Sequence, residues 1–159
     1  MQIFYRKAGN TMERKLDHID KQIIQILQQN ARTPLKDIAK EVFLSSPAVS
    51  ARIERMEKAG IITGYQVKIN SQKFGYHIKA FINLEVNPSQ KKEFLPFIAS
   101  IPNVIECDWV TGDYSMLIEV SFQTTLQLDH FISELQKFGR TKTQIAISTL
   151  VDQRDVPLK

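Results

Sequence analysis

The sequence predicts an α+β protein in which a three-helix unit with a helix-turn-helix precedes a βαββαβ sheet unit. Apolar residues recur at helical spacing up to Gly60, and strand-like and helix-like segments then alternate to about Val151. Charge also divides the chain. Residues 1–70 carry 12 Lys and Arg against 7 Asp and Glu, whereas residues 71–159 carry 9 against 10. The basic first half favours a polyanion as partner.

The first two helices are predicted from their caps and apolar stripes. Asp17 can cap a helix over residues 16–30, because its carboxylate can accept hydrogen bonds from free N–H groups of the first turn. Thr33 is expected to cap the second helix, with Pro34 at the first position, where no N–H is needed. The stripes consist of Ile19, Ile23, Ile26 and Leu27 in the first helix, and Leu35, Ile38, Ala39 and Val42 in the second.

The third helix follows a short turn at residues 43–45. Ser45 or Ser46 is expected to cap it, with Pro47 in its first turn and Gly60 just beyond its end. Its buried stripe is predicted to be Val49, Ile53 and Met56. Two short helices joined by a tight turn are typical of DNA-binding proteins in which the later helix enters the major groove.

The second half predicts a ferredoxin-like sandwich. Thr124 is expected to cap its second helix, and Gly112-Asp113 marks a turn between two of its strands. Strands are expected at residues 77–86, 104–111, 114–122 and 143–151, and helices at 89–100 and 124–138, after an alternating linker strand at 66–70. This gives a DNA-binding domain over 13–64, a linker over 65–76 and a sheet domain over 77–152. Helices cover only one face of such a sheet, so we expect a second copy to cover the other.

Composition indicates a cytoplasmic protein. The single cysteine, Cys107, cannot form an internal disulfide and is expected to be an ordinary strand residue rather than a reactive thiol. No apolar run is long enough to cross a membrane, and residues 1–11 do not resemble a secretory signal. We assign residues 1–11 no function. The sequence pattern also predicts no metal site and no cofactor site.

Double-stranded DNA is the partner that the third helix fits. Small residues let its backbone approach base edges, a hydroxyl can bond to several bases, and a methyl can touch thymine. Arg52 and Arg55 are expected to be exposed and to reach a guanine edge or a phosphate, and Arg32 and Lys36 lie beside the start of the second helix. The predicted DNA-binding residues are Arg32, Lys36, Ser45, Ser46, Ala48, Ser50, Ala51, Arg52 and Arg55. A partner-binding module with a merely solvated basic face is the alternative.

A series of short motifs runs through about residues 14–151: Leu16-Asp17-His18-Ile19-Asp20, Ala31-Arg32, Ile38-Ala39, Leu44-Ser45, Val49, Arg52-Ile53, Gly60-Ile61-Ile62-Thr63-Gly64-Tyr65 and Val110-Thr111-Gly112-Asp113-Tyr114. In this order, the motifs resemble the leucine-responsive regulator/AsnC family of feast/famine transcription regulators. The resemblance implies dimers, an octamer of four dimers, and an amino acid as the effector. It implies an effector site made by Gly112, Asp113, Tyr114 and Ser115 together with Thr143 of the last strand.

This sequence departs from the family pattern at three places. Phe43 stands where the family usually has glycine, a position that often needs a positive φ. The family's signature turn corresponds here to Val110-Thr111-Gly112-Asp113-Tyr114 and the residue after it. Ser115 replaces the second aspartate of this turn, which removes a carboxylate that could hold an effector's ammonium group. Near the end, Arg140 replaces valine and Ile145 replaces a threonine. The last two departures weaken the case for an amino-acid effector.

Two other functions compete with a sensing regulator. One is a nucleoid-like protein that organises DNA without an effector. The other is an enzyme similar to sirohaem decarboxylases of related architecture. The three histidines, His18, His77 and His130, are scattered and stand beside no evident nucleophile or carboxylate pair. We therefore expect a protein that is not an enzyme.

Overall fold

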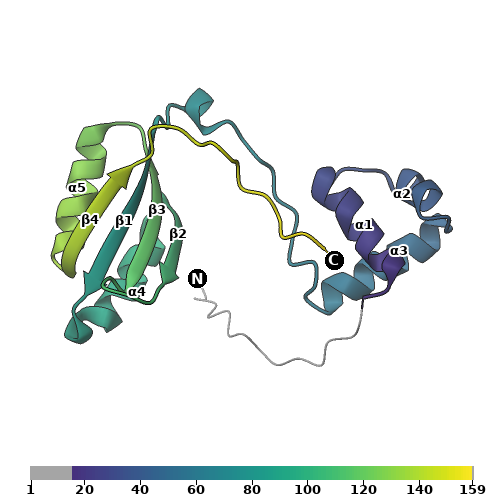
Figure 1. The fold of residues 1–159 in the computed structure, drawn as a ribbon, viewed down its shortest axis with the longest axis horizontal. Helices are drawn as coiled ribbons and strands as arrows, with labels where there is room; N and C mark the ends of the chain where they lie inside the picture. Colours follow the sequence, from purple (N-terminus) through teal and green to yellow (C-terminus); the bar gives the residue numbers. More distant parts are fainter. Residues whose placement is uncertain (1–15, 159) are drawn as a thin grey trace. The chain divides into compact units, whose positions relative to one another are not determined.

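The computed structural model describes residues 16–158, so the expected domain start at residue 13 and the segment 1–11 lie outside the described part. The chain divides into two compact units (Figure 1). We call residues 16–68 with 153–158 the helical unit, and residues 69–152 the sheet unit. The division after Lys68 falls inside the stretch that the sequence marks as linker.

The helical unit consists of α1 (His18–Gln29), α2 (Leu35–Glu41) and α3 (Ser46–Lys58). Asp17 begins α1 as predicted: its carboxylate accepts from the Asp20 N–H at 2.8 Å, and the Asp20 carboxylate accepts from the Asp17 N–H at 3.2 Å. Ser45 begins α3, because its hydroxyl oxygen accepts from the Ala48 N–H at 3.4 Å. These two local caps fix where the first and third helices start.

The start of α2 differs from the prediction. Pro34 is the cap residue and makes no side-chain capping bond. Thr33 instead donates its hydroxyl to the Asn30 carbonyl at 2.7 Å, which closes the turn after α1. Leu35, expected in the buried stripe, is exposed, but Ile38, Ala39 and Val42 are buried as predicted. They pack with Ile23 of α1 and with Val49 and Met56 of α3 into one core.

The expected linker strand at residues 66–70 is wrong for this chain. The segment lies extended but belongs to no sheet, and a 3-10 helix, η1 (Ser71–Phe74), follows it. Alternation of Val67 and Ile69 with polar residues predicted a strand, yet both side chains are exposed. Alternation alone cannot form a strand, because the backbone needs a partner for its hydrogen bonds.

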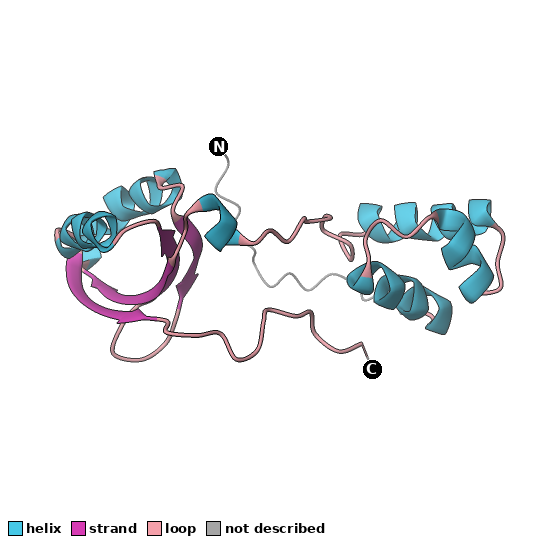
Figure 2. Ribbon diagram, turned by 90° about the horizontal axis from the view of Figure 1, so that it is seen from above, coloured by secondary structure: helices cyan, strands magenta, loops and turns pink. Residues whose placement is uncertain are grey.

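The sheet unit contains β1 (Ile78–Val86), η2 (Pro88–Gln90), α4 (Lys91–Ser100), β2 (Val104–Trp109), β3 (Met116–Phe122), α5 (Thr125–Gln136) and β4 (Gly139–Ile145). The strands form one antiparallel sheet in the order β2-β3-β1-β4. Thr124 caps α5 in a capping box, as predicted. Both helices cover one face of the curved sheet (Figure 2), where Phe94, Ile82, Ile118 and Leu135 are fully buried.

The last strand lies earlier than predicted. It begins at Gly139 and ends at Ile145, where it pairs with Ala80 of β1, whereas the sequence suggested residues 143–151. The apolar residues Ile147, Leu150 and Val151 produced the misleading pattern, and all three are exposed. Pairing with β1, rather than the apolar pattern, defines the extent of β4.

The second face of the sheet carries polar and charged side chains and is covered by no helix of the described chain. Lys79 pairs with Glu119 at 2.9 Å, and Arg140 pairs with Glu85 at 3.1 Å.

Burial raises the pKa of the Cys107 thiol to about 11, which fits an unreactive strand residue. Within residues 16–158, no helix is both long and apolar enough to cross a membrane.

Candidate nucleic-acid interface

The turn between α2 and α3 has the geometry of a helix-turn-helix. It is closed by the Leu44 N–H, which donates to the Ala39 carbonyl at 2.9 Å. Phe43 reaches this geometry with a φ of 55°, the left-handed value that the family's usual glycine adopts easily. The predicted conflict between side chain and backbone at Phe43 is therefore present, and the turn keeps its shape in spite of it.

The amino-terminal half of α3 offers small side chains to solvent. Ala51 is exposed, whereas Ser46, Ala48 and Ser50 are half-buried. Ser50 also donates its hydroxyl to the Glu54 carboxylate at 3.4 Å. Ser45 is exposed at the helix start, where free backbone N–H groups can meet a phosphate. The surface can approach a groove closely and contact base edges through methyl and hydroxyl groups.

The expected exposure of Arg52 is wrong. Its side chain is only 24% exposed, and one guanidinium nitrogen contacts Asp17 at 2.6 Å and Asp20 at 2.8 Å. Arg55 binds the same Asp20 carboxylate at 2.6 Å rather than its sequence neighbours Glu54 and Glu57. We call Asp17, Asp20, Arg52 and Arg55 the α1–α3 clamp. It ties the start of the first helix to the middle of the third.

The clamp was missed because its partners lie more than 30 positions apart in the sequence. A sequence pattern that could have predicted the clamp was present: two carboxylates three residues apart at one helix, and two guanidinium groups three residues apart on another. Side chains three apart lie on the same helix face, so each pair can act as one charged patch. Asp20 is almost fully buried, and such a carboxylate requires a partner.

Asp17 of the clamp is expected to make the stability of the helical unit sensitive to acid. The hydrogen bond from Arg52, followed by that from the Asp20 N–H, lowers the pKa of Asp17 below its ordinary value of 3.8. A lowered folded-state pKa stabilises the fold above about pH 4, and this contribution disappears as the pH falls through the lowered value. Asp17→Asn should therefore reduce the drop in the unfolding midpoint between about pH 5 and pH 2.

Thermal unfolding of the helical unit across this pH range measures the effect. The same amide substitution at exposed Asp129 of α5 is the control, and it should leave the pH dependence of the helical unit as in the wild type. An Asp17→Asn protein with the wild-type pH dependence would show that the clamp does not contribute to acid sensitivity.

Exposed cations flank the helix-turn-helix at the start of α2. Arg32 and Lys36 are both exposed, and the Arg32 N–H is held by the Asn30 side chain at 3.0 Å. Lys40, one turn further along α2, pairs with Asp37 at 3.5 Å. Lys58 of α3 lies 3.9 Å from Glu54. Arg32 and Lys36 are therefore exposed cations outside the α1–α3 clamp.

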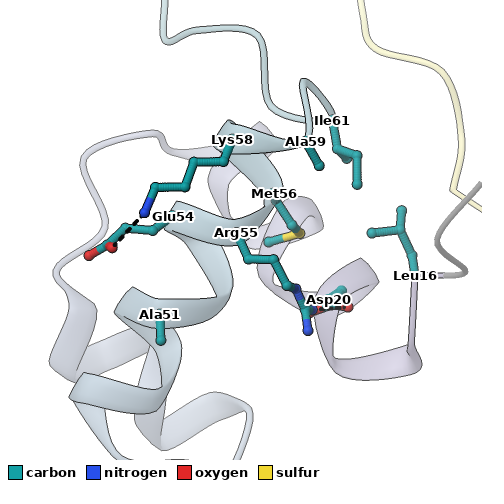
Figure 3. A pocket seen from close by; sticks show the side chains of 9 residues that line it. All are labelled: Leu16, Asp20, Ala51, Glu54, Arg55, Met56, Lys58, Ala59 and Ile61. Carbon is teal, nitrogen blue, oxygen red and sulfur yellow. Dashed lines mark hydrogen bonds and ion pairs between the residues drawn. The ribbon is translucent and has the colours of Figure 1, made fainter. Parts of the chain in front are cut away.

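The helical unit also has a hollow of about 640 Å³ beside α3 (Figure 3). Its apolar wall includes Leu16, Met56 and Ile61. The charged groups around it face one another, with Lys58 directed to Glu54 and Arg55 to Asp20. A second hollow, of about 310 Å³, is lined by the helical unit as well. Neither hollow includes a residue of the turn expected to bind an effector.

The expected effector residues are only partly brought together. Gly112 has a φ of 114° in the turn between β2 and β3. The Ser115 hydroxyl accepts from the Val86 N–H at 3.1 Å and lies 3.3 Å from the Leu84 carbonyl, so it helps to hold the turn against β1. Thr143 lies beside Ile82 on the other side of β1. Asp113 is exposed.

Arg140 is a neighbour of the turn that the sequence did not suggest as a site residue. Its guanidinium lies 5.0 Å from the centre of the Tyr114 ring, and it binds Glu85 at 3.1 Å. This contact joins the start of β4 to the signature turn.

The three histidines are not brought together in the fold. His18, His77 and His130 are exposed and lie on separate elements: α1, the segment before β1, and α5. Within the same range, no group of three His, Cys, Asp or Glu residues could hold a metal ion.

Comparisons with known proteins match both halves of the chain. A winged helix-turn-helix DNA-binding model matches residues 16–63, and the Lrp/AsnC ligand-binding domain matches residues 79–156. The transcriptional regulator LrpA of Bacillus subtilis is 32% identical over 133 residues, which cover 83% of this chain and 98% of LrpA.

Solved structures agree with the fold. E. coli AsnC is 27% identical, with a TM-score of 0.82 over 90% of this chain and 99% of AsnC. A feast or famine regulatory protein of M. tuberculosis, Rv3291c, solved with L-methionine, is 27% identical, with a TM-score of 0.83 over 89% of this chain and 99% of that one. These likenesses confirm the predicted fold class.

The relatives are regulators, which agrees with the expectation that the protein is not an enzyme. The DNA-binding model precedes the ligand-binding model in the order that the sequence motifs predicted. With a relative above 30% identity that matches nearly over its full length, the chain belongs to the Lrp/AsnC family of HTH-type transcriptional regulators.

Proposed function

We propose that the protein is an oligomeric regulator that binds specific double-stranded DNA through α3 and responds to an amino acid or another small metabolite. The observation that carries the DNA part is the start of α3, where a capped helix end meets small, uncharged side chains, while exposed cations lie at the start of α2 in the same unit. Helix ends of this kind suit phosphates, and small residues suit base edges. Because its target would be chromosomal DNA, we place the protein in the cytoplasm.

The predicted DNA-binding residues divide into three roles in this proposal. Arg32 and Lys36 contact phosphates, which sets the orientation of the protein on the duplex. Arg52 and Arg55 position α3 through the clamp, instead of reaching a guanine edge or a phosphate as first expected. The residues that meet base edges or nearby phosphates are Ser45, Ser46, Ala48, Ser50 and Ala51.

Oligomerisation follows from the sheet face that the helices leave uncovered. A second copy packed there would form a dimer, and four dimers would form the octamer that the family resemblance implies. A twofold dimer presents two copies of α3 to two half-sites on the DNA. Because the two half-sites must be spaced like the two α3 helices, the dimer would bind DNA more specifically than one copy, even if each copy makes no additional contact with the DNA.

The effector site would lie near the turn formed by Gly112, Asp113, Tyr114 and Ser115, with Thr143 on the neighbouring part of the sheet. Support comes from the ligand-binding family model and from the relative solved with L-methionine. The Ser115 hydroxyl is used to hold the turn, so Asp113 is the carboxylate left in this turn for an ammonium group.

Binding of the purified full-length protein to the DNA upstream of its own coding region tests the proposal. A scrambled fragment of equal length and a pool of randomised duplexes complete the comparison, at one fixed salt concentration. We expect a preferred duplex, from the upstream region or the pool, bound about a thousandfold more tightly than the scrambled fragment. A mixture of amino acids should change that affinity.

The other outcomes separate the competing functions. Equal affinity for all fragments, with no effect of amino acids, would favour a nucleoid-like protein and overturn sequence-specific regulation. Failure to bind any duplex would overturn the proposed DNA function altogether.

A further inference from the structure

Phe43 combines two unfavourable features in the turn before α3. It has the one positive φ among the non-glycine residues of the described chain, at 55°. Its ring is 93% exposed, more than the exposed aromatic residues Phe74 at 62% and Trp109 at 58%. A left-handed conformation is costly for a side chain with a Cβ, and exposing an aromatic ring to water forgoes the gain from burying it.

The fold of the turn does not need this ring. The turn is closed by backbone groups, through the bond from the Leu44 N–H to the Ala39 carbonyl. Glycine or asparagine would adopt the same backbone conformation more easily. Backbone strain that does not serve the fold is often found at functional positions. The ring therefore needs a role outside the folded unit.

The position of Phe43 indicates what the ring would meet. It lies two residues before Ser45, the cap of α3, and so next to the helix end that would enter the groove in the proposed function. The exposed side chains at this helix start are small, and the two arginines of α3 are held by the clamp. Phe43 is therefore the large apolar group at this end of the helix.

We propose that Phe43 is a DNA-contacting residue whose ring packs against a thymine methyl group at the edge of the major groove. This inference rests on the proposed function. Duplex DNA presents the C5-methyl of thymine in the major groove, where phenylalanine can contact it through apolar surface. The contact would give α3 a preference for thymine near its amino end, in addition to any methyl contact that its small side chains make.

The test compares wild type with Phe43→Gly, Phe43→Asn and Phe43→Tyr in full-length protein, on the duplex that wild type binds best. Glycine and asparagine relieve the strain, so we expect the unfolding midpoint of the helical unit to rise by a few degrees. We expect DNA affinity to fall about tenfold in both variants, because the apolar contact is lost. Tyrosine keeps the ring and should keep most of the affinity.

A second arm replaces thymidine by deoxyuridine in the same duplex, which removes the methyl groups. Wild type should lose affinity for the uracil duplex, and Phe43→Gly should lose clearly less. A Phe43→Gly protein that binds the thymine duplex as tightly as wild type would overturn the inference. Equal losses for both proteins on uracil DNA would overturn the thymine contact.

The failure of this inference can be told from the failure of the proposed function. If wild type binds no duplex, both fall together. If wild type binds its preferred duplex and the glycine variant binds it equally well, only the role of Phe43 falls. A lower unfolding midpoint in both the glycine and asparagine variants would also contradict the account, because the ring would then stabilise the turn.

Discussion

Asp20→Ala should lower the free energy of unfolding of the helical unit by about 3 kcal/mol, the lower end of the range for breaking a buried ion pair. The Asp20 side chain is 3% exposed and binds Arg52 at 2.8 Å and Arg55 at 2.6 Å. It also accepts the Asp17 N–H. The loss stays moderate because Arg52 keeps Asp17 as a partner and Arg55 can be hydrated.

Unfolding followed by helical circular dichroism measures this effect, and the part of that signal from α4 and α5 is the part that changes together with the sheet unit. Trp109, the single tryptophan of the chain, lies in β2, so its fluorescence reports the sheet unit separately and should not change. Asp37→Ala is the matched control, since Asp37 is more exposed and pairs only with Lys40 at 3.5 Å. It should cost less than about 1 kcal/mol. Equal losses in the two variants would refute a structural role for the clamp.

The same comparison decides what Arg52 does. If Arg52 positions α3, Arg52→Ala should reduce stability and DNA affinity together, as Asp20→Ala does. A folded Arg52→Ala protein of wild-type stability with weakened specific binding would instead support the original expectation of a base contact.

Gly139→Ala should destabilise the sheet unit by about 3 kcal/mol or more. Gly139 has a φ of 155°, and an added Cβ would lie 1.8 Å from the Glu85 carbonyl oxygen of β1. The carbonyl belongs to the backbone of a central strand, so it cannot move aside without disturbing the β1–β4 pairing. Denaturant unfolding followed by Trp109 fluorescence measures the loss.

Gly112→Ala is the control for the conformational part of this effect. Gly112 has a φ of 114°, but an added Cβ there meets no atom within 4 Å. It should cost only about 1–2 kcal/mol, the penalty of a strained backbone without a clash. If Gly139→Ala is no worse than Gly112→Ala, the close approach of β4 to β1 does not limit the stability of the unit.

The helices were predictable because their signals are local. Asp17, Ser45 and Thr124 each accept a backbone N–H three residues ahead, so short sequence windows contain the whole interaction. The apolar stripes of α1, α2 and α3 also identified most of the core of the helical unit. The order of strands and helices then restricted the sheet to a small number of arrangements.

Features that depend on distant partners were not predictable from the same windows. The extent of β4 is defined by its pairing with β1, and residues 66–70 have no partner strand within residues 16–158 of one copy. The exposure of Arg52 was misjudged because its two carboxylate partners lie on another helix. Helical periodicity shows which way a side chain points, but it does not show what stands opposite.

The most direct test of the account places a negative charge on α3. Ala51 is exposed and lines the hollow beside this helix (Figure 3), and we expect glutamate at this position to repel the phosphates of a bound duplex. Gln25→Glu serves as the control. It adds the same charge at an exposed position of α1, on the side of that helix opposite buried Ile23. The account predicts that Ala51→Glu keeps the wild-type unfolding midpoint but binds the preferred duplex about a hundredfold more weakly, while Gln25→Glu binds nearly as wild type. Wild-type affinity of Ala51→Glu for that duplex would contradict it, because α3 would then not be the element that enters the groove.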